Sequence, residues 1–445
     1  MAKITFLGAG STIFAKNILG DAMLSPALRD AEIALYDIDG SRLQESKIML
    51  DRLNEKLNQG RASIKAHLGN RGRRAALRGA DYVVNAIQVG GYEPCTVIDF
   101  EVPKKYGLRQ TIGDTLGIGG IFRGLRTAHV MLQIAGDMEK ECPEAWLLNY
   151  TNPMSIVTGI MLRHTGIKTV GLCHSVQVCA RGLLRHLGML DKVKKLRWKI
   201  AGINHMGWLL EITDDGRDLY PEIKKRAERL NRAARTRGAE KHHDMVRFEI
   251  MKHFSYYVTE SSEHSAEYFP YWIKSSHPEL IDEFHIPLDE YPRRCELQIE
   301  FWKKRAKDIV HGKDITHERT GEYGSYIMES LETDTAVSIG GNVLNQGLIP
   351  NLPSAAVVEV PCMVDGQGVQ GVYSGELPEQ LAALNRSHIS VHLMTIEAAM
   401  TLRKEAVYQA AYLDPHTGSE LTLDRTRELC DELLEAEADW LPAYK

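Results

Sequence analysis

The chain has 445 residues, of which 44% are hydrophobic and 25% are charged, a composition that excludes an intrinsically disordered or fibrous protein. Its formal net charge of -5 argues against a protein that binds nucleic acid or other polyanions. The two basic runs at residues 71–78 and 224–238 are therefore expected to be solvated helix faces or loops.

Buried strands and amphipathic helices alternate through the first half of the chain. The predicted strands are residues 3–10, 32–38, 81–88, 145–152 and 168–175, and the helices between them include residues 12–24, 41–57 and 121–141. Short continuous apolar runs are typical of buried parallel strands, and apolar residues at helical spacing are typical of the helices that cover them. The alternation predicts an α/β fold with a Rossmann-type, doubly wound sheet.

The second half of the chain is less regular. Helical segments alternate with extended pieces such as residues 354–364, and a helical segment at residues 390–413 lies near the end. No linker or low-complexity tract separates the two halves. We predict an NAD-binding domain of residues 1–195, and an α+β domain of residues 196–445 that completes the substrate and metal site.

The sequence predicts a cytoplasmic protein that does not associate with a membrane. The chain enters a strand directly at "MAKITFLGAGST", and no run of 18 apolar residues follows. Its seven cysteines are an odd number, widely spaced and without a CxxC pair. In a cytosolic chain this pattern indicates free thiols, most of them buried.

A glycine turn after the first strand predicts a dinucleotide site. In "FLGAGSTIF", Gly8 and Gly10 lie between a strand and a helix, where glycine lets the backbone approach a pyrophosphate. Position 13 is Ile, so the third glycine of the GxGxxG pattern is absent. Asp37 at the end of the second strand favours the ribose hydroxyls of NAD over NADP. The predicted cofactor residues are Gly8, Gly10, Ser11, Thr12, Asp37 and Asn85.

Two further segments suggest a metal site. Cys173 and His174 follow a predicted strand, and "AGINHMGW" supplies Asn204 and His205 about thirty residues later. A thiolate and an imidazole leave coordination positions open for substrate and water, and imidazole suits Mn, Fe, Co, Ni or Zn. Either residue alone is more often part of a protein core.

Other polar side chains gather at predicted loops and strand ends. They come from "LNYTNP", "QTIGDTLGIGG", "TESSEHSAEYFPY" and "DEYPRR", and include Asn149, Asn152, Asp114, Thr115, Glu260, Glu263, His264, Glu267, Tyr268, Arg293 and Arg294. Any one of them could be structural. Together they predict a site for a polyhydroxylated ligand.

Seven motifs that span nearly the whole chain resemble one enzyme family. "GAGST", "GGYEPCTVIDFEVPKKYGLRQTIGDT", "LNYTNPM", "GLCHSVQ", "AGINHM", "VTESSEHSAEY" and "LDEYPRRC" are similar to glycoside hydrolase family 4, in its α-galactosidase branch. The resemblance implies a fold related to lactate and malate dehydrogenases. It also implies a glycosidase that depends on NAD and on Mn²⁺ or another divalent metal, outside the usual two-carboxylate mechanism.

The mechanism that the resemblance implies is oxidation and elimination. The sugar is oxidised at C3, a base removes the C2 proton, the aglycone leaves with acid assistance, water adds and the hydride returns. The resemblance places metal ligands at Cys173 and His205, a substrate contact at Asn149 and the acid at His174. For the base, Tyr268 is preferred over Glu263. Asp114, His264 and Arg294 complete the predicted substrate site.

The loop "KKYGLRQTIGDT" differs from the phosphosugar branches, which favours a non-phosphorylated α-galactoside such as melibiose as the small-molecule substrate. An α-glucosidase or α-galacturonidase of the same family remains an alternative, as does an NAD-dependent sugar or hydroxy-acid dehydrogenase. A homo-oligomer, dimer or tetramer, is expected. The C4 stereochemistry of the sugar, the physiological metal and the oligomer size are left open by the sequence.

Overall fold

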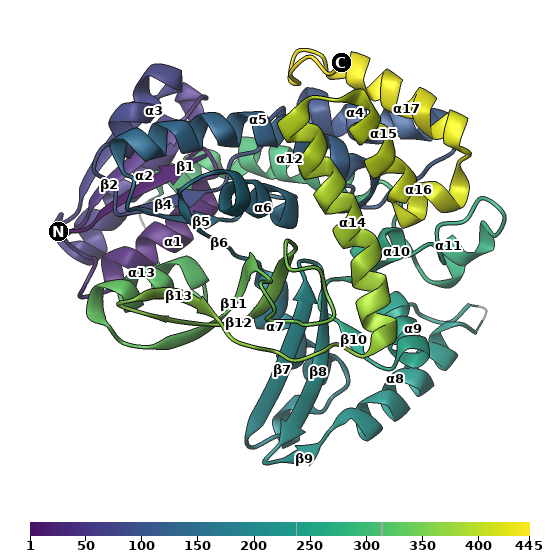
Figure 1. Ribbon diagram of the computed structural model, residues 1–445. Helices are drawn as coiled ribbons and strands as arrows, with labels where there is room; N and C mark the ends of the chain where they lie inside the picture. The colour runs from purple at the N-terminus through teal and green to yellow at the C-terminus, as the bar shows by residue number, and fades with distance from the viewer. Residues whose placement is uncertain (237, 313–314) are drawn as a thin grey trace.

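The computed structural model describes residues 1–236, 238–312 and 315–445. Its described strands form one continuous sheet in the order β10-β8-β7-β12-β11-β6-β5-β4-β1-β2-β3, with β13 paired to β12 and β9 to β8. In Figure 1 the N-terminal strands lie on the left, and β7 and β8 extend toward the bottom. The sheet therefore passes through both halves of the chain.

The strands of the N-terminal half form the parallel part of the sheet. They are β1 (Lys3–Leu7), β2 (Glu32–Asp37), β3 (Ser63–Leu68), β4 (Tyr82–Asn85), β5 (Trp146–Asn149) and β6 (Lys168–Gly171). Neighbours in the order β3-β2-β1-β4-β5-β6 are all parallel. This is the strand order of a Rossmann sheet, which binds ligands beyond the carboxyl ends of its strands, where the order reverses between β1 and β4.

Helices cover both faces of the parallel sheet. One face carries α1 (Thr12–Leu24), α2 (Gly40–Asn58) and α13 (Tyr323–Thr333), and the other carries α3 (Gly69–Leu77), α5 (Gly117–Glu141) and α6 (Met154–His164). Adjacent residues of β4 point to opposite faces, so Val84 belongs to the buried cluster that includes Leu19, and Val83 to the one that includes Met131. Burial on both faces explains why these strands are continuous apolar runs.

The C-terminal half continues the sheet with antiparallel strands. They are β7 (Leu196–Ile203), β8 (Met206–Asp214), β9 (Arg217–Asp218), β10 (Tyr257–Val258), β11 (Val337–Leu344), β12 (Val357–Asp365) and β13 (Gly368–Gly371). β11 joins β6 where Asn342 faces Gly171, and β12 joins β7 where Glu359 faces Gly202. These junctions place the β7–β8 turn at the same edge of the sheet as the carboxyl end of β6, with β11 and β12 between them.

The remaining helices surround the two ends of the sheet. They are the π-helical η1 (Gly91–Thr96), α4 (Val97–Lys105), α7 (His174–His186), the 3-10 turn η2 (Leu190–Lys192), α8 (Tyr220–Ala234), α9 (Met245–Phe254), α10 (Ser262–Tyr268), α11 (Glu279–Glu283), α12 (Glu290–His311), α14 (Glu379–Thr401), α15 (Lys404–Leu413), α16 (Pro415–Glu420) and α17 (Leu423–Ala436). α14 begins near β10 and runs to the C-terminal helices (Figure 1). Trp208 of β8 donates to Asn385 of α14 over 2.9 Å, which ties the antiparallel strands to this helix.

The predicted fold class is confirmed, and the helix predicted at residues 12–24 coincides with α1. The prediction missed β3, so the strand predicted third in the chain is β4. β7 begins at Leu196, the first residue of the predicted second domain, but the sheet is continuous there. Among the described residues, no helix combines the length and apolar character needed to cross a bilayer.

Candidate active site

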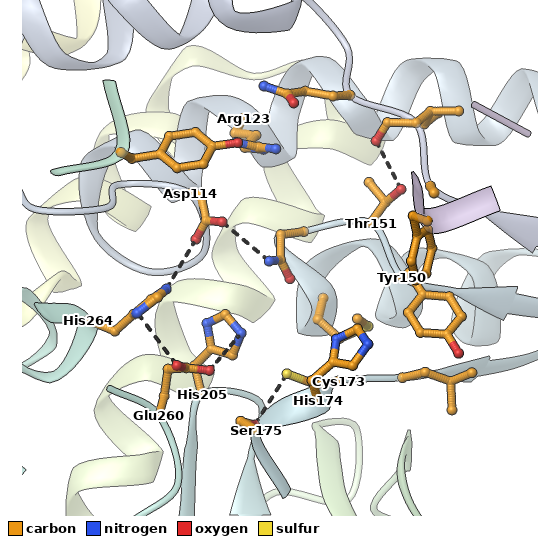
Figure 2. A pocket seen from close by; sticks show the side chains of 18 residues that line it. Asp114, Arg123, Tyr150, Thr151, Cys173, His174, Ser175, His205, Glu260 and His264 are labelled. Carbon is orange, nitrogen blue, oxygen red and sulfur yellow. Dashed lines mark hydrogen bonds and ion pairs between the residues drawn. The ribbon is translucent and has the colours of Figure 1, made fainter. Parts of the chain in front are cut away.

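A cavity of about 400 Å³ opens at the carboxyl ends of the parallel strands (Figure 2). Residues that follow β4, β5 and β6 line one side of it. The β7–β8 turn, the start of the α10 region and the loop before α5 supply the other side. This is the edge where Rossmann sheets bind their ligands, and the volume is typical of a small-molecule site.

The glycine turn beside the cavity has the close packing that a dinucleotide site requires. Gly8 has a φ of +85°, and a Cβ there would lie 2.6 Å from the carbonyl oxygen of Ala86. Gly10 donates its backbone N–H to Asp37 Oδ2 over 2.6 Å, and a Cβ on Gly10 would lie 2.8 Å from the same oxygen. The turn and the carboxylate at the end of β2 therefore fit the pyrophosphate and ribose of NAD.

The other predicted cofactor residues differ in their access to this edge. Ser11 is exposed directly before α1, whereas Thr12 is buried. The Thr12 hydroxyl accepts a hydrogen bond from Ser46 Oγ over 2.9 Å and donates to the Gly10 carbonyl over 3.4 Å. Asn85 is fully buried at the end of β4, and its amide donates to Asn149 Oδ1 over 2.9 Å and to Thr151 Oγ1 over 3.1 Å. Asn85 therefore reaches the cavity only through Thr151, which lines it.

Cys173, His205 and Glu260 form a group of possible metal ligands. One ligand atom of each lies within 4.8 Å of the others. Cys173 follows β6, His205 forms the β7–β8 turn with a φ of +62°, and Glu260 follows β10. His205 Nε2 lies 3.6 Å from Glu260 Oε2. The sequence predicted Cys173 and His205 as metal ligands, and Glu260 only as one of the polar residues of the ligand site.

The charges in this group favour a bound cation. Burial opposes the charged form of His205, but Cys173 and Glu260 outweigh that effect and raise the pKa of the imidazole to about 10. Burial on its own would raise the pKa of the Glu260 carboxyl, but His264 and His205 outweigh burial and lower that pKa below its usual range. A thiolate, an imidazole and a carboxylate suit a divalent transition metal, so these residues fit one.

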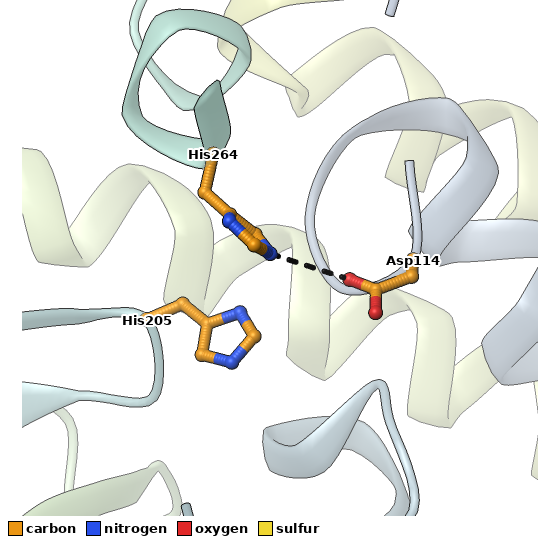
Figure 3. A group of neighbouring side chains, drawn as sticks. All are labelled: Asp114, His205 and His264. Atoms are coloured by element: carbon orange, nitrogen blue, oxygen red, sulfur yellow. Dashed lines mark ion pairs between the residues drawn. The ribbon is translucent and has the colours of Figure 1, made fainter. Parts of the chain in front are cut away.

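A second group shares His205 with the first. Asp114, His205 and His264 also have ligand atoms within 4.8 Å of one another, and Figure 3 shows them facing a common space. His264 Nε2 lies 4.0 Å from Asp114 Oδ1, and its Nδ1 lies 2.8 Å from Ser261 Oγ. Burial lowers the pKa of His264 below its usual value. The structure thus brings the predicted substrate residues Asp114 and His264 into the cavity.

His174 lines the cavity and has a carboxylate partner. It begins α7, directly after Cys173, and its Nε2 lies 2.7 Å from Glu322 Oε2. Its ring packs near the rings of Tyr150 and Phe14, with centroids 6.0 and 6.2 Å away. The hydrogen bond to Glu322 raises the pKa of the imidazole. Glu322 would therefore orient His174 as a proton donor, while the imidazole still faces the cavity.

Tyr268, Glu263 and Arg294, all predicted site residues, do not line the cavity. Tyr268 is fully buried behind His205, with its hydroxyl oxygen 3.1 Å from His205 Nδ1. Glu263 lies on another face of α10 and pairs with Arg294 over 3.3 Å. Since α10 turns Glu263 away from Tyr268, one short helix cannot present both side chains to the substrate.

Asn149 is also placed differently from its predicted role. It is the last residue of β5, is fully buried, and donates to Thr158 Oγ1 over 3.2 Å. Asn152 lies three residues further on, lines the cavity, and donates to Asp114 Oδ2 over 3.3 Å. The "LNYTNP" segment therefore contributes Asn152 to the cavity. Asn149 instead holds the loop, through hydrogen bonds with the backbone of Thr151.

Several residues of the site were not identified from the sequence. Arg123 of α5 and Tyr291 of α12 line the cavity, with Arg123 Nη1 3.4 Å from the Tyr291 hydroxyl. Glu267 accepts hydrogen bonds from the backbone N–H groups of residues 111, 112 and 113, and so holds the loop that carries Asp114. Glu267 had appeared only as one polar residue of a motif, and Arg123 sits in a helix whose spacing indicates packing alone.

Two family models match most of the chain. The model of the family 4 glycosyl hydrolases matches residues 3–189, and that of the family 4 glycosyl hydrolase C-terminal domain matches residues 200–417. The two matches cover the strands and helices that build the cavity. They confirm the family resemblance predicted from the motifs.

Full-length relatives agree with these matches. The chain is 61% identical to the α-galactosidase of Bacillus subtilis, with 100% of each chain covered. It is 34% identical to the α-galactosidase of Rhizobium meliloti, over 99% of this chain and 89% of that one. Among solved structures, the 6-phospho-β-glucosidase of Thermotoga maritima with manganese, NAD+ and glucose-6-phosphate has a TM-score of 0.77 at 20% identity, over 99% of this chain and 100% of that one, a likeness of fold.

Proposed function

The chain belongs to family 4 of the glycosyl hydrolases, and we propose that it is an NAD- and divalent-metal-dependent α-galactosidase. The observation that carries the proposal is that Cys173, His205 and Glu260 line one cavity together with Ala86, the residue against which Gly8 of the glycine turn packs. The 61% identity to an α-galactosidase along the whole chain supports the choice of sugar.

The chain's own residues would hold the two cofactors. Gly8, Gly10 and Asp37 fit NAD, and Cys173 and His205, with Glu260 beside them, fit Mn²⁺ or another divalent ion. When bound, the nicotinamide exchanges a hydride with the sugar and the ion draws charge from the sugar oxygens. The fold neighbour from Thermotoga maritima carries both manganese and NAD+.

We assign the proton donor to His174. Its Nε2 is engaged with Glu322, so Nδ1 is the nitrogen left for the cavity. From there His174 gives a proton to the glycosidic oxygen as the aglycone departs. Asn152 and Asp114, joined by a 3.3 Å hydrogen bond, are placed to bind sugar hydroxyls.

We assign removal of the C2 proton to His264 in place of Tyr268. His264 lines the cavity, whereas Tyr268 has its hydroxyl against His205. A base must reach the proton that it removes. In deuterated water at saturating metal, His264→Asn should lose deuterium incorporation at C2 of the product, and Tyr268→Phe should keep it. The reverse result would return the role to Tyr268.

The cavity suits a sugar without a phosphate group. In the described part of the chain, its lining includes the acids Asp114 and Glu260, and Arg123 is its one arginine or lysine. The carboxyl of Asp114 balances the charge of Arg123: burial alone would raise the pKa of Asp114, but the attraction of Arg123 contributes most to lowering it. Beyond Arg123, a phosphate dianion would find no arginine or lysine among the described residues of this lining to recognise it.

The test is a panel of nitrophenyl α-galactoside, α-glucoside and α-galacturonide, assayed with and without NAD+, Mn²⁺ and a thiol reductant. Hydrolysis of the galactoside should require all three additions, because oxidation of Cys173 would remove its thiolate. Full activity after dialysis and chelation would refute the mechanism. Preference for another glycoside would refute the choice of substrate, and net NADH formation would indicate a dehydrogenase instead.

A further inference from the structure

A second group of metal-ligating side chains lies away from the cavity. His186 ends α7, and His243 and Asp244 directly precede α9. One ligand atom of each lies within 4.8 Å of the others. None of the three lines the active-site cavity. We propose that His186, His243 and Asp244 bind one divalent transition-metal ion, and we call this group the α7–α9 site.

The spacing of the side chains fits shared coordination. His186 Nδ1 lies 2.9 Å from Asp244 Oδ2. Two ligands bound to one zinc ion at tetrahedral geometry are separated by roughly 3.3 Å, so a small shift admits an ion between them. The His243 ring is stacked on the His186 ring, with 4.3 Å between their centroids. The stacking keeps the second imidazole close to His186 and Asp244.

The carboxylate is already held in position. Asp244 is 1% exposed, accepts a hydrogen bond from the Tyr257 hydroxyl over 2.9 Å, and pairs with Arg247. Carboxylates that are fixed by outer hydrogen bonds are typical of metal sites. Because Arg247 balances the charge of Asp244, the two imidazoles must provide much of the affinity, so the site selects an ion that favours nitrogen.

His242 borders the site but is not one of its ligands. Its Nδ1 accepts the backbone N–H of Asp244 over 3.2 Å, and its ring centroid lies 5.2 Å from that of His186. A neutral ring with an accepting Nδ1 carries its proton on Nε2, and this nitrogen cannot then bind a metal.

The donor set defines the class of ion. Two imidazole nitrogens and one carboxylate oxygen suit Zn²⁺, Ni²⁺ or Co²⁺ better than Mg²⁺ or Ca²⁺, which prefer oxygen ligands. His243 is exposed, so an ion can enter from solvent and water can complete its coordination. The site would join the end of α7 to the start of α9. The other end of α7, roughly 18 Å away along the helix, begins with His174.

The test measures Zn²⁺ bound per chain by equilibrium dialysis. The proposed catalytic ligands are first removed in a Cys173→Ser, His205→Asn double variant of the full chain. This variant should bind one equivalent of Zn²⁺, and adding His243→Ala should reduce that to none. Zn²⁺ should raise the melting temperature of the double variant and leave that of the triple variant unchanged, because only a ligand of the folded state stabilises it.

His253→Ala is the matched control, since His253 is an exposed histidine near the end of α9. Added to the double variant, it should leave the bound equivalent in place. The proposal is overturned if the double variant binds no Zn²⁺, or if His243→Ala leaves binding unchanged. In wild type, His243→Ala alone should remove one equivalent and leave the rest, a measurement that is independent of the proposed α-galactosidase activity.

Discussion

Removing the carboxylate partner of His174 should weaken acid catalysis selectively. The Glu322 side chain is 9% exposed and that of His174 is 54% exposed, with 2.7 Å between Oε2 and Nε2. A buried hydrogen bond to a charged group contributes about 1.5–3 kcal/mol. Water competes for the half-exposed imidazole, so we take about 1 kcal/mol, or roughly a fivefold change in rate.

The effect should depend on the leaving group. Acid assistance is worth about 10²- to 10⁴-fold for a poor leaving group and much less for a stabilised phenolate. His174→Asn should therefore slow hydrolysis of melibiose severely and of nitrophenyl α-galactoside modestly. Glu322→Ala should show the same contrast at about fivefold, and Glu322→Gln, which retains a hydrogen-bonding side chain, should recover part of the loss.

The assay is kcat/KM for both substrates at saturating NAD+ and Mn²⁺. Glu318→Ala serves as the control, because Glu318 is an exposed acid on the same segment. An equal loss on both substrates would contradict the reasoning, since it would mean that Glu322 supports the fold or the metal site and does not orient the acid.

Three further predictions concern the cofactors and the fold. Gly8→Ala should lower NAD+ affinity at least about tenfold by calorimetry, because its Cβ would meet a carbonyl group just after β4. Gly79→Ala, with φ +66° and open space around it, should keep that affinity. Cys173→Ser should lose bound metal and retain NAD+, and Asp37→Ala should do the reverse; equal loss of both ligands in both variants would indicate unfolding. Burial raises the pKa of Asp137, but two arginines of α3 outweigh it and lower the pKa, so Asp137→Asn should reduce the free energy of unfolding by about 1–2 kcal/mol at pH 7. Because a depressed pKa stabilises the fold only above the unfolded value, this difference should shrink in denaturant titrations below about pH 4.

The sequence predicted the buried strands well and the edge strand poorly. Strands such as β4 and β5 are fully or almost fully buried, so their residues form apolar runs that stand out. β3 lies at the edge of the sheet, and Ser63, Lys65 and Ala66 in it are exposed. An edge strand that is half in solvent does not need an apolar run, and its pairing with β2 is a long-range contact that local pattern does not reveal.

The sequence located the site better than it assigned its side chains. Cys173, His205, Asp114 and His264 were expected at loop and strand ends, and the structure brings all four to one cavity. Which residue of a loop faces the cavity depends on backbone direction, and so Asn152 lies there while the predicted Asn149 is buried. The spacing of residues within a motif does not predict which way the backbone turns each side chain.

Glu322 shows a further limit, because its contact with His174 depends on packing between distant segments. It lies 148 residues further along the chain. Asp21 of α1 holds the segment before it, accepting hydrogen bonds from His317 Nε2 over 2.7 Å and from the backbone N–H of Thr320 over 2.8 Å. The helix that begins at the dinucleotide turn therefore also anchors the partner of the proposed acid. A change that displaces α1 should accordingly affect both NAD+ affinity and the leaving-group dependence, whereas Glu322→Ala should affect only the second.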